Sequence, residues 1–223
     1  MKALFGDQPF NDKYHLGAVN SINWARILAQ TIYYFLAYFH VRRQIPHPEG
    51  SELQFVVPTG NFGDVLAGYY AKRMGLPTGK LVIATNSNDI LARFWRNGRY
   101  EKIDSTAGAT TLPSRGGGVA ADEKPVADGD VRVTLSPAMD ILVSSNFERL
   151  LWYLAYESYG AAPDSARRAS AGLTVDGWMK SVKSNGRVEV PVETLELARR
   201  DFLAERVSDD QVCCVCVRSG GKA

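Results

Sequence analysis

The stretch Phe55-Val-Val-Pro-Thr-Gly-Asn-Phe-Gly-Asp64 determines how the rest of the chain is arranged, because an apolar run gives way there to a glycine-bearing turn. The β-branched and apolar residues of 53–57 predict a strand buried on both faces. Pro58 has no amide hydrogen to donate and is expected to end that strand. Apolar residues recur at helical spacing through 65–74, which predicts a helix directly after the turn.

The predicted turn has the features of an anion site. Gly60 and Gly63 permit backbone angles, or a close approach of another backbone, that a Cβ would prevent. Asp64 is expected to cap a helix that begins at Val65, where unpaired amides and the positive end of the helix dipole can bind a phosphate. The residues match neither a nucleotide P-loop nor a dinucleotide fingerprint. From the pattern alone, a strand-to-helix turn without a ligand remains the preferred alternative.

The elements that follow predict an α/β class. The apolar segment 80–85 is a second candidate strand, so strand, helix and strand alternate. Such a unit forms a parallel sheet with a right-handed crossover, and ligands bind at the carboxyl ends of its strands. A further helix is predicted from Ile90, after the polar residues 86–89, and Gly98 is expected to end it.

A long helix is predicted before this unit, from Trp24 to Arg43. Its apolar residues recur three or four positions apart and predict a stripe that packs against a sheet, formed by Trp24, Ile27, Leu28, Ile32, Phe35, Leu36 and Phe39. Polar residues interrupt the apolar run, which is shorter than the ~20 residues that a membrane span needs. We therefore expect a core or interface helix and no membrane partner.

The composition is that of an ordinary globular chain. Among 223 residues, 26 basic side chains nearly balance 24 acidic ones, which leaves no electrostatic footprint for nucleic acid. The first residues contain no apolar signal core, so a cytoplasmic location is expected. The three histidines share no spacing that would form a metal site. Nor do Cys213, Cys214 and Cys216 have the spacing of a disulfide framework or a zinc site.

Three longer motifs occur in order along the chain: Val19-Asn-Ser-Ile-Asn-Trp-Ala-Arg-Ile-Leu-Ala-Gln30, Pro58-Thr-Gly-Asn-Phe-Gly-Asp64 and Leu135-Ser-Pro-Ala-Met-Asp-Ile141. Together they resemble the threonine synthases of the fungal and bacterial type, a branch of the fold type II pyridoxal-phosphate enzymes. The resemblance runs from about Ala3 to about Asp210, with one interruption. It implies a parallel-sheet βαβ core like that of the tryptophan synthase β chain.

The resemblance also implies a cofactor site. In that family the glycine-bearing loop binds the phosphate of pyridoxal 5'-phosphate, which assigns cofactor binding to Gly60, Asn61, Phe62, Gly63 and Asp64. Polar residues cluster where a loop enters the long helix, and helix capping explains one or two of them equally well. For these the resemblance favours substrate binding: Asn20, Ser21, Asn23 and Arg26. In the third motif a structural role is favoured for Ser136, Met139 and Asp140.

Three parts of the family pattern are absent from the chain, one of them the Ser/Thr/Gly-rich cofactor motif that follows the catalytic lysine. The lysine that forms the Schiff base precedes, in those enzymes, the region that begins at Met1 here. The late Ser or Thr that meets the pyridine nitrogen is also missing. The catalytic residues are therefore unknown, and the chain resembles an internal fragment that is inactive alone.

The activity that the resemblance implies is the conversion of O-phospho-L-homoserine and water into L-threonine and phosphate. The full-length enzyme is expected to be a monomer or a weak dimer. The alternative is a non-catalytic α/β fragment that binds phosphate or pyridoxal phosphate without lyase activity.

Changes in composition divide the chain into four segments. Residues 1–104 are predicted to form a partial cofactor-binding α/β domain with the phosphate loop. Residues 105–133, rich in Ala, Gly, Thr, Asp and Pro, are predicted to be a flexible insertion. Residues 134–210 are expected to continue the domain mainly as helices, the last of them over 192–207. An aberrant tail is expected at 211–223, with a short apolar edge strand as the alternative.

Overall fold

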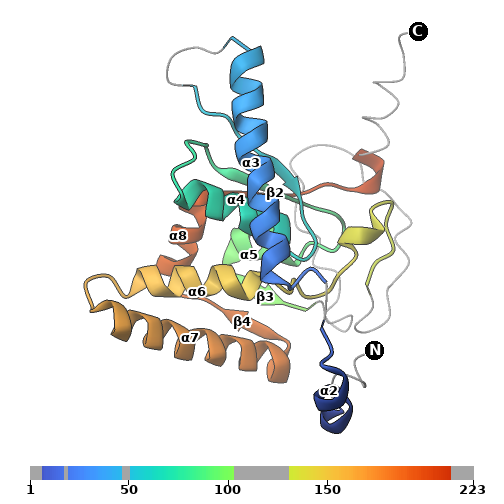
Figure 1. Cartoon of the computed structure of the whole chain (residues 1–223), viewed down its shortest axis with the longest axis vertical. Helices are drawn as coiled ribbons and strands as arrows, with labels where there is room; N and C mark the ends of the chain where they lie inside the picture. The colour runs from blue at the N-terminus through green and yellow to red at the C-terminus, as the bar shows by residue number, and fades with distance from the viewer. Residues whose placement is uncertain (1–6, 18–19, 47–50, 103–130, 212–223) are drawn as a thin grey trace.

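The computed structural model describes residues 7–17, 20–46, 51–102 and 131–211. Its helices and strands follow one another in this order (Figure 1): α2 (Gln8–Tyr14), α3 (Trp24–Gln44), β1 (Val56–Pro58), α4 (Gly63–Arg73), β2 (Leu81–Thr85), α5 (Ile90–Asn97), β3 (Arg99–Glu101), the 3-10 turn η1 (Pro137–Met139), α6 (Phe147–Ser158), α7 (Asp164–Asn185), β4 (Arg187–Glu189), α8 (Val192–Asp201) and β5 (Phe202–Arg206). The predicted α/β class is confirmed.

A parallel sheet with the strand order β1-β2-β5 organises the fold. Strands β1 and β2 pair in parallel with Val57 opposite Ile83, and α4 connects them, so the predicted strand-helix-strand unit is confirmed. Strand β1 nevertheless includes Pro58, and its Val56 side chain is 64% exposed. The prediction of a strand buried on both faces is wrong for β1, because β1 is an edge strand of the described sheet and tolerates both features.

The last strand of this sheet was assigned to a helix by the sequence pattern. Helix α8 ends at Asp201, and β5 follows at once and pairs in parallel with β2, with Phe202 opposite Leu81. The Phe202 side chain is fully buried. The prediction of one helix over 192–207 is therefore wrong, because strand pairing and burial outweigh the helical preference of the local residues.

Helix α3 packs chiefly against α4 and not against the sheet. Its buried residues are Ile27, Thr31, Tyr34 and Tyr38. The Tyr34 hydroxyl donates to the Asp64 carbonyl oxygen at 2.8 Å, and the Thr31 hydroxyl donates to the Ile27 carbonyl oxygen at 3.1 Å. Because both hydroxyl groups are hydrogen-bonded, Tyr34 and Thr31 can be buried in the interface between α3 and α4.

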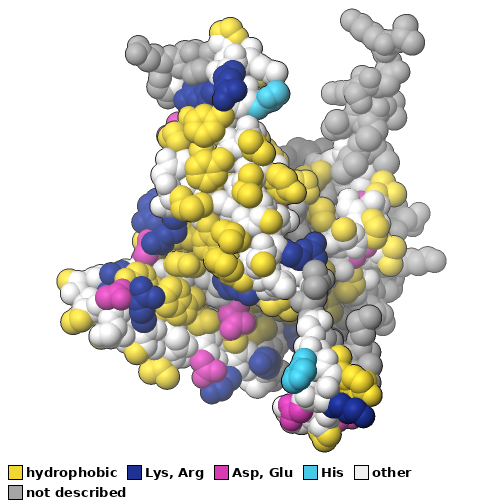
Figure 2. Space-filling view, viewed as in Figure 1, with side chains coloured by type: hydrophobic (Ala, Val, Ile, Leu, Met, Phe, Trp, Pro, Cys, Tyr) yellow, Lys and Arg dark blue, Asp and Glu magenta, His cyan; other side chains and the backbone are white. Residues whose placement is uncertain are grey.

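Most of the predicted apolar stripe of α3 is exposed in the structure. Figure 2 shows hydrophobic side chains gathered along this helix, and the exposed ones include Trp24, Leu28, Ile32, Leu36 and Phe39. The prediction that this stripe packs against a sheet is wrong. Apolar residues lie on more than one face of the helix, and spacing alone does not tell which face is covered.

An aromatic cluster joins the first and last parts of the described chain. The ring of Phe147, in α6, lies with its centroid 5.4 Å from that of Phe62 and 4.8 Å from that of Phe94. Trp95 and Phe202 extend the cluster, with ring centroids 5.6 Å apart. Helices α4, α5 and α6 and strand β5 are therefore held around one core.

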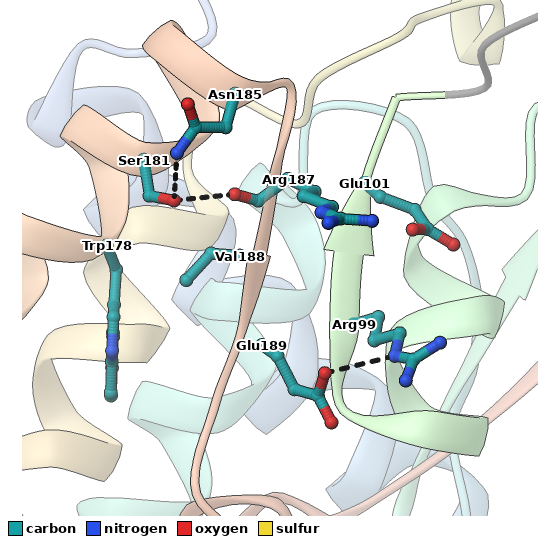
Figure 3. A pocket seen from close by; sticks show the side chains of 8 residues that line it. All are labelled: Arg99, Glu101, Trp178, Ser181, Asn185, Arg187, Val188 and Glu189. Carbon is teal, nitrogen blue, oxygen red and sulfur yellow. Dashed lines mark hydrogen bonds and ion pairs between the residues drawn. The ribbon is translucent and has the colours of Figure 1, made fainter.

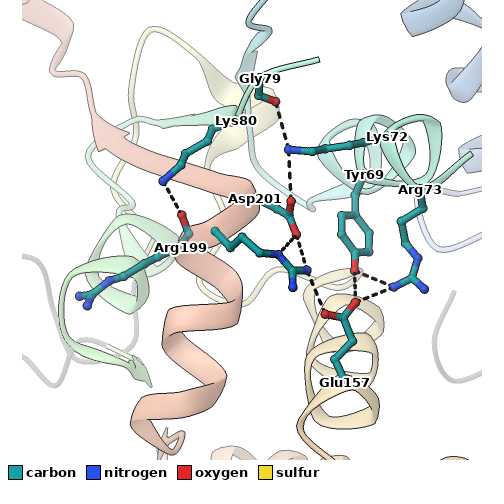
Figure 4. Close-up of polar contacts among 9 residues, drawn as sticks. Tyr69, Lys72, Arg73, Gly79, Lys80, Glu157, Arg199 and Asp201 are labelled. Carbon is teal, nitrogen blue, oxygen red and sulfur yellow. Dashed lines mark hydrogen bonds and ion pairs between the residues drawn. The ribbon is translucent and has the colours of Figure 1, made fainter. Parts of the chain in front are cut away.

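Ion pairs tie α4, α6 and α8 together on the side of the core shown in Figure 4. Glu157 of α6 accepts from Arg73 of α4 at 2.9 Å and from Arg200 of α8 at 2.9 Å. Asp201 pairs with Lys72 at 3.1 Å and with Arg200 at 2.8 Å. The two carboxylates thus share the Arg200 guanidinium, and Arg73 and Lys72 join them to α4. Together these ion pairs link three helices that lie far apart in the sequence.

Several predictions concern residues outside the described ranges. The predicted insertion at 105–133 is described only from residue 131, and the predicted tail at 211–223 only at Gln211. All three cysteines are also outside. Within the described ranges, no helix combines the length and the apolarity that crossing a membrane requires.

The packing of α3 on α4 can be tested at Gly68. A Cβ at this position would lie 2.7 Å from two carbons of the Tyr34 ring, closer than any real contact. We expect Gly68→Ala to lower the free energy of unfolding by ~1–3 kcal/mol, because the ring must shift out of a packed contact. Urea denaturation followed by circular dichroism measures this change.

Gly177→Ala is the matched control for this experiment. Gly177 lies within α7, and its Cβ would meet no atom within 4 Å. The same substitution should therefore raise stability by ~0.5–1 kcal/mol through the better helix propensity of alanine. Equal effects at the two glycines would contradict the packing described here.

Candidate functional site

The glycine-bearing loop lies at the carboxyl end of β1 and leads directly into α4. A pocket of about 390 Å³ opens over it. The pocket is lined by residues of this loop, of the entry to α3 and of η1, which are Ser21, Arg26, Gln30, Pro58, Thr59, Gly60, Asn61, Phe62, Gly63, Asp64, Val65 and Ala138. All five residues assigned to cofactor binding therefore face one cavity at the edge of the sheet where α/β proteins bind ligands.

The loop has an unusual backbone at Phe62, which adopts a left-handed conformation with φ of 63°. Such a conformation costs a residue other than glycine ~1–3 kcal/mol. The Phe62 side chain is only 1% exposed and packs in the aromatic cluster against Phe147. Burial of the ring therefore offsets the strain and fixes the loop.

Helix α4 begins two residues earlier than the sequence predicted. It starts at Gly63, its N-cap residue is Phe62, and no side chain caps it. Asp64 lies in the first turn of the helix, so the prediction that Asp64 caps a helix beginning at Val65 is wrong. The left-handed backbone of Phe62 turns the chain directly into α4. Phe62 therefore occupies the N-cap position, and Asp64 lies inside the helix, where its carboxylate does not cap it.

Five successive amides of the loop and helix start are available to a ligand. Within the part of the chain that the structure describes, no protein acceptor receives a hydrogen bond from the backbone N–H groups of Asn61, Phe62, Gly63, Asp64 and Val65. The positive end of the α4 dipole adds to the field of these donors. A row of donors of this kind is able to accept an anion without help from a charged side chain.

The two glycines of the loop have different roles. A Cβ on Gly60 would lie 3.0 Å from the Ala138 carbonyl oxygen and from Met139 Cα, so glycine is needed for the close approach of η1. A Cβ on Gly63 would lie 3.6 Å from the nearest side-chain atoms, those of Asn146 and Gln30, which is an ordinary contact. Gly63 therefore leaves room in the pocket but is not required by crowding of its Cβ.

The structure separates the four candidate substrate residues into two pairs. Ser21 and Arg26 line the pocket. Asn20 and Asn23 are not among the lining residues, and their side chains make local turns. The Asn20 side chain accepts from the amide of Ile22 at 3.0 Å, and the Asn23 side chain caps α3 by accepting from the amide of Ala25 at 2.9 Å. The Asn20 side chain thus forms a local turn, and the Asn23 side chain forms the helix cap.

Sequence reasoning missed two polar residues that line the pocket, Gln30 and Thr59. Gln30 lies one helical turn after Arg26 on the same face of α3, and this spacing of four is the signal that could have identified it. Thr59 is buried, and its hydroxyl donates to the Val57 carbonyl oxygen at 2.6 Å. The Arg26 guanidinium makes no hydrogen bond or ion pair within the described residues, so its charge is available to the pocket.

Asp140 anchors the segment whose Ala138 lines the pocket. Its Oδ1 accepts from Asn86 at 2.7 Å, from Thr134 at 2.7 Å and from Asn88 at 3.1 Å. The predicted helix start at Pro137 is only the three-residue turn η1. The carboxylate therefore fixes η1 to the carboxyl end of β2, next to Gly60.

A second pocket lies between the β3–β4 ribbon and the end of α7 (Figure 3). Its volume is about 500 Å³, and Trp178 and Ser181 of α7 form one wall. Arg99 pairs with Glu189 across the ribbon at 3.1 Å, and Glu101 stands opposite Arg187 in the same register. Two arginines and two glutamates line this pocket, so its charged side chains are balanced in number.

The chain is closely similar to curated threonine synthases. It is 54% identical to the Schizosaccharomyces pombe enzyme and 49% identical to the Saccharomyces cerevisiae enzyme, over 95% of the chain in each case. The same alignments cover 37% and 35% of those proteins, so the chain spans about a third of the length of these relatives. No protein-family model matches the chain.

Solved structures give the same result. The crystal structure of threonine synthase from yeast matches 94% of the chain and 34% of its own length, with a TM-score of 0.74 and 48% identity. A threonine synthase from Brucella melitensis with bound PLP matches 98% of the chain and 39% of its own length, with a TM-score of 0.72 and 37% identity. The α/β fold with a parallel sheet that the resemblance implied is confirmed.

The electrostatics of Asp64 give a testable pH dependence. Burial raises the pKa of the Asp64 carboxyl above its ordinary value of 3.8, and the Tyr34 hydroxyl partly opposes this rise. The protonated form is therefore favoured by folding, and this contribution to stability is lost as the pH rises through the folded-state pKa. Asp64→Asn, which does not ionise, should gain stability relative to the unsubstituted chain as the pH rises above about 4.

Thermal or urea unfolding of both chains across this pH range measures the effect. The expected result is a difference in unfolding free energy that grows with pH and then levels off. A difference that is constant, or that shrinks with rising pH, would show that the Asp64 carboxylate is not disfavoured by its surroundings.

Proposed function

The chain belongs to the threonine synthase family, and we propose that it forms the part of such an enzyme that binds the phosphate of pyridoxal 5'-phosphate. The proposed activity of the complete enzyme is the conversion of O-phospho-L-homoserine and water into L-threonine and phosphate. The observation that carries the proposal is the row of unpaired amides from Asn61 to Val65 at the start of α4.

The residues of the pocket fit the phosphate group of this cofactor. Backbone amides converge on the space in front of α4, and Gly63 leaves that space open. A phosphate dianion matches both the donors and the positive end of the helix dipole. When bound, the cofactor would supply an electron sink for the carbanion that forms beside the amino group of the substrate.

Arg26, Ser21 and Gln30 line the other side of the same pocket. We assign to the Arg26 guanidinium the binding of a second anionic group, the carboxylate or phosphate of the substrate. A guanidinium binds either group through paired N–H donors, and Arg26 has no competing protein acceptor within the described residues. The role of Ser21 and Gln30 is to orient that group by neutral hydrogen bonds.

The chain alone is proposed to be catalytically inactive. No lysine is among the described residues that line the pocket, and cofactor attachment and α-proton removal both require such an amine. In the complete enzyme the lysine would come from sequence that the longer relatives possess. The second candidate function is non-catalytic binding of phosphate or pyridoxal phosphate. The lack of a lysine among the described residues that line the pocket favours it.

The complete enzyme is further proposed to act on a small-molecule substrate in the cytoplasm, as a monomer or weak dimer without nucleic-acid or membrane partners. The near balance of 26 basic and 24 acidic residues supports the absence of a nucleic-acid surface. Light scattering of the complete enzyme would test the oligomeric state, and a stable tetramer would contradict it.

Substitution of Gly63 tests the proposed phosphate site. We expect Gly63→Val to weaken the binding of inorganic phosphate and pyridoxal phosphate at least tenfold, or ~1.4 kcal/mol, because two methyl groups enter the pocket. Gly63→Ala is the control and should bind within about threefold of the unsubstituted chain, since its Cβ makes ordinary contacts at 3.6 Å. Arg26→Gln should leave phosphate binding at the amides measurable but weaker. Calorimetry that finds equal affinity in all four chains would place the anion elsewhere.

Absorbance spectroscopy tests whether a lysine of this chain attaches the cofactor. If the chain binds pyridoxal phosphate without covalent attachment, the bound cofactor should keep the spectrum of its free aldehyde and be removed by dialysis. Retention after borohydride reduction would show that a lysine of this chain attaches the cofactor. That outcome would overturn the proposal that the chain alone is inactive for lack of such a lysine.

A further inference from the structure

Three successive residues before α6 all direct their side chains to the anion-binding loop. The Ser144 hydroxyl donates to the Gly60 carbonyl oxygen at 2.9 Å, and the Ser145 hydroxyl donates to Asn61 Oδ1 at 3.2 Å. The third residue, Asn146, has no exposed surface. Its Nδ2 donates to the Asn61 carbonyl oxygen at 3.0 Å, and its backbone amide donates to the same oxygen at 3.1 Å.

Helix capping does not explain this arrangement. Asn146 occupies the N-cap position of α6, yet no side chain there caps the helix. The Ser145 hydroxyl donates to Asn61 and makes no capping hydrogen bond to α6. The three side chains are therefore used for the loop and not for the helix that they precede.

Asn146 also reaches the other wall of the pocket. The second hydrogen of its Nδ2 group goes to the Ser21 carbonyl oxygen at 2.7 Å. Arg149 strengthens this contact, since its Nη1 donates to Asn146 Oδ1 at 2.7 Å and its Nη2 to the Ile22 carbonyl oxygen at 2.7 Å. One buried carboxamide thus links the anion-binding loop to the segment that enters α3.

Hydrogen bonds to the carbonyl oxygens of the loop also fix the direction of the amides that follow them. In a trans peptide the carbonyl oxygen and the following N–H group point in opposite directions. Two hydrogen bonds hold the Asn61 carbonyl toward Asn146, which turns the Phe62 amide away from α6. In the same way, the bond from Ser144 to the Gly60 carbonyl turns the amide of Asn61.

We propose that Asn146 is a positioning residue for the bound anion, and this inference rests on the proposed function. Asn146 sets the direction of the Phe62 N–H group. It also fixes the distance between the backbone amides of 61–65 and the side of the pocket formed by Ser21 and Arg26. Because its carboxamide is fully buried with every donor and acceptor used, it holds one geometry. Asn146 itself is not among the residues that line the pocket.

The test compares anion affinity among folded variants. Asn146→Ser is too short to bridge Ser21 and Asn61, and we expect it to lose tenfold or more in affinity for inorganic phosphate by calorimetry. Arg149→Met removes only the outer bonds of the network and should lose about threefold, ~0.6 kcal/mol. Val182→Ala, a buried position of α7 outside the pocket, is the stability control and should bind phosphate within twofold.

Amide chemical shifts supply a readout that general destabilisation would not change. On titration with phosphate, the signals of Asn61 and Phe62 should shift in the unsubstituted chain and in Val182→Ala, but little in Asn146→Ser. Full affinity in Asn146→Ser or in Arg149→Met would overturn the inference while leaving the proposed function intact. Failure of the unsubstituted chain to bind phosphate would overturn the proposed function, and the inference with it.

Discussion

The left-handed backbone of Phe62, held by the burial of its ring, is the constraint on which the rest of the site depends. With φ of 63°, the residue turns the chain from β1 into α4 within a few positions and leaves the amides of the turn without protein acceptors. A glycine would adopt the same φ at a lower conformational energy, but it would have no side chain to pack in the core. The conformation persists because Phe147 and Phe202 pack against that ring.

In the proposed phosphate site, backbone dipoles are the main source of the field that would attract an anion. Arg26 is the guanidinium among the pocket-lining residues, and Asp64 contributes a carboxyl group of opposite sign. Amide donors keep their direction without side-chain ordering, so they bind a phosphate at little entropic cost. A site of this kind holds and orients a group well, and the acid-base chemistry must come from other residues.

Local sequence predicted the parts of the structure that local chemistry determines. The strand-turn-helix at Gly60 and the end of α5 at Gly98 depend on glycine and on the residues beside it. Strand β5 was missed because the partner that makes 202–206 a strand, β2, lies about 120 residues earlier in the chain. The contacts of Asn146 were missed for the same reason, since a carboxamide before a helix has the pattern of a cap.

The hydrogen bonds that shape the anion site also set the order in which it can form. Ser144 and Asn146 reach the loop across 84 and 85 positions of sequence, and Asn146 reaches Ser21 across 125. Closing such large loops costs entropy before any contact rewards it, so these bonds form late in folding. On the ribosome, the loop at 60–64 leaves the exit tunnel well before α6 does. The full set of contacts around the proposed phosphate site therefore requires α6 to be docked on the loop.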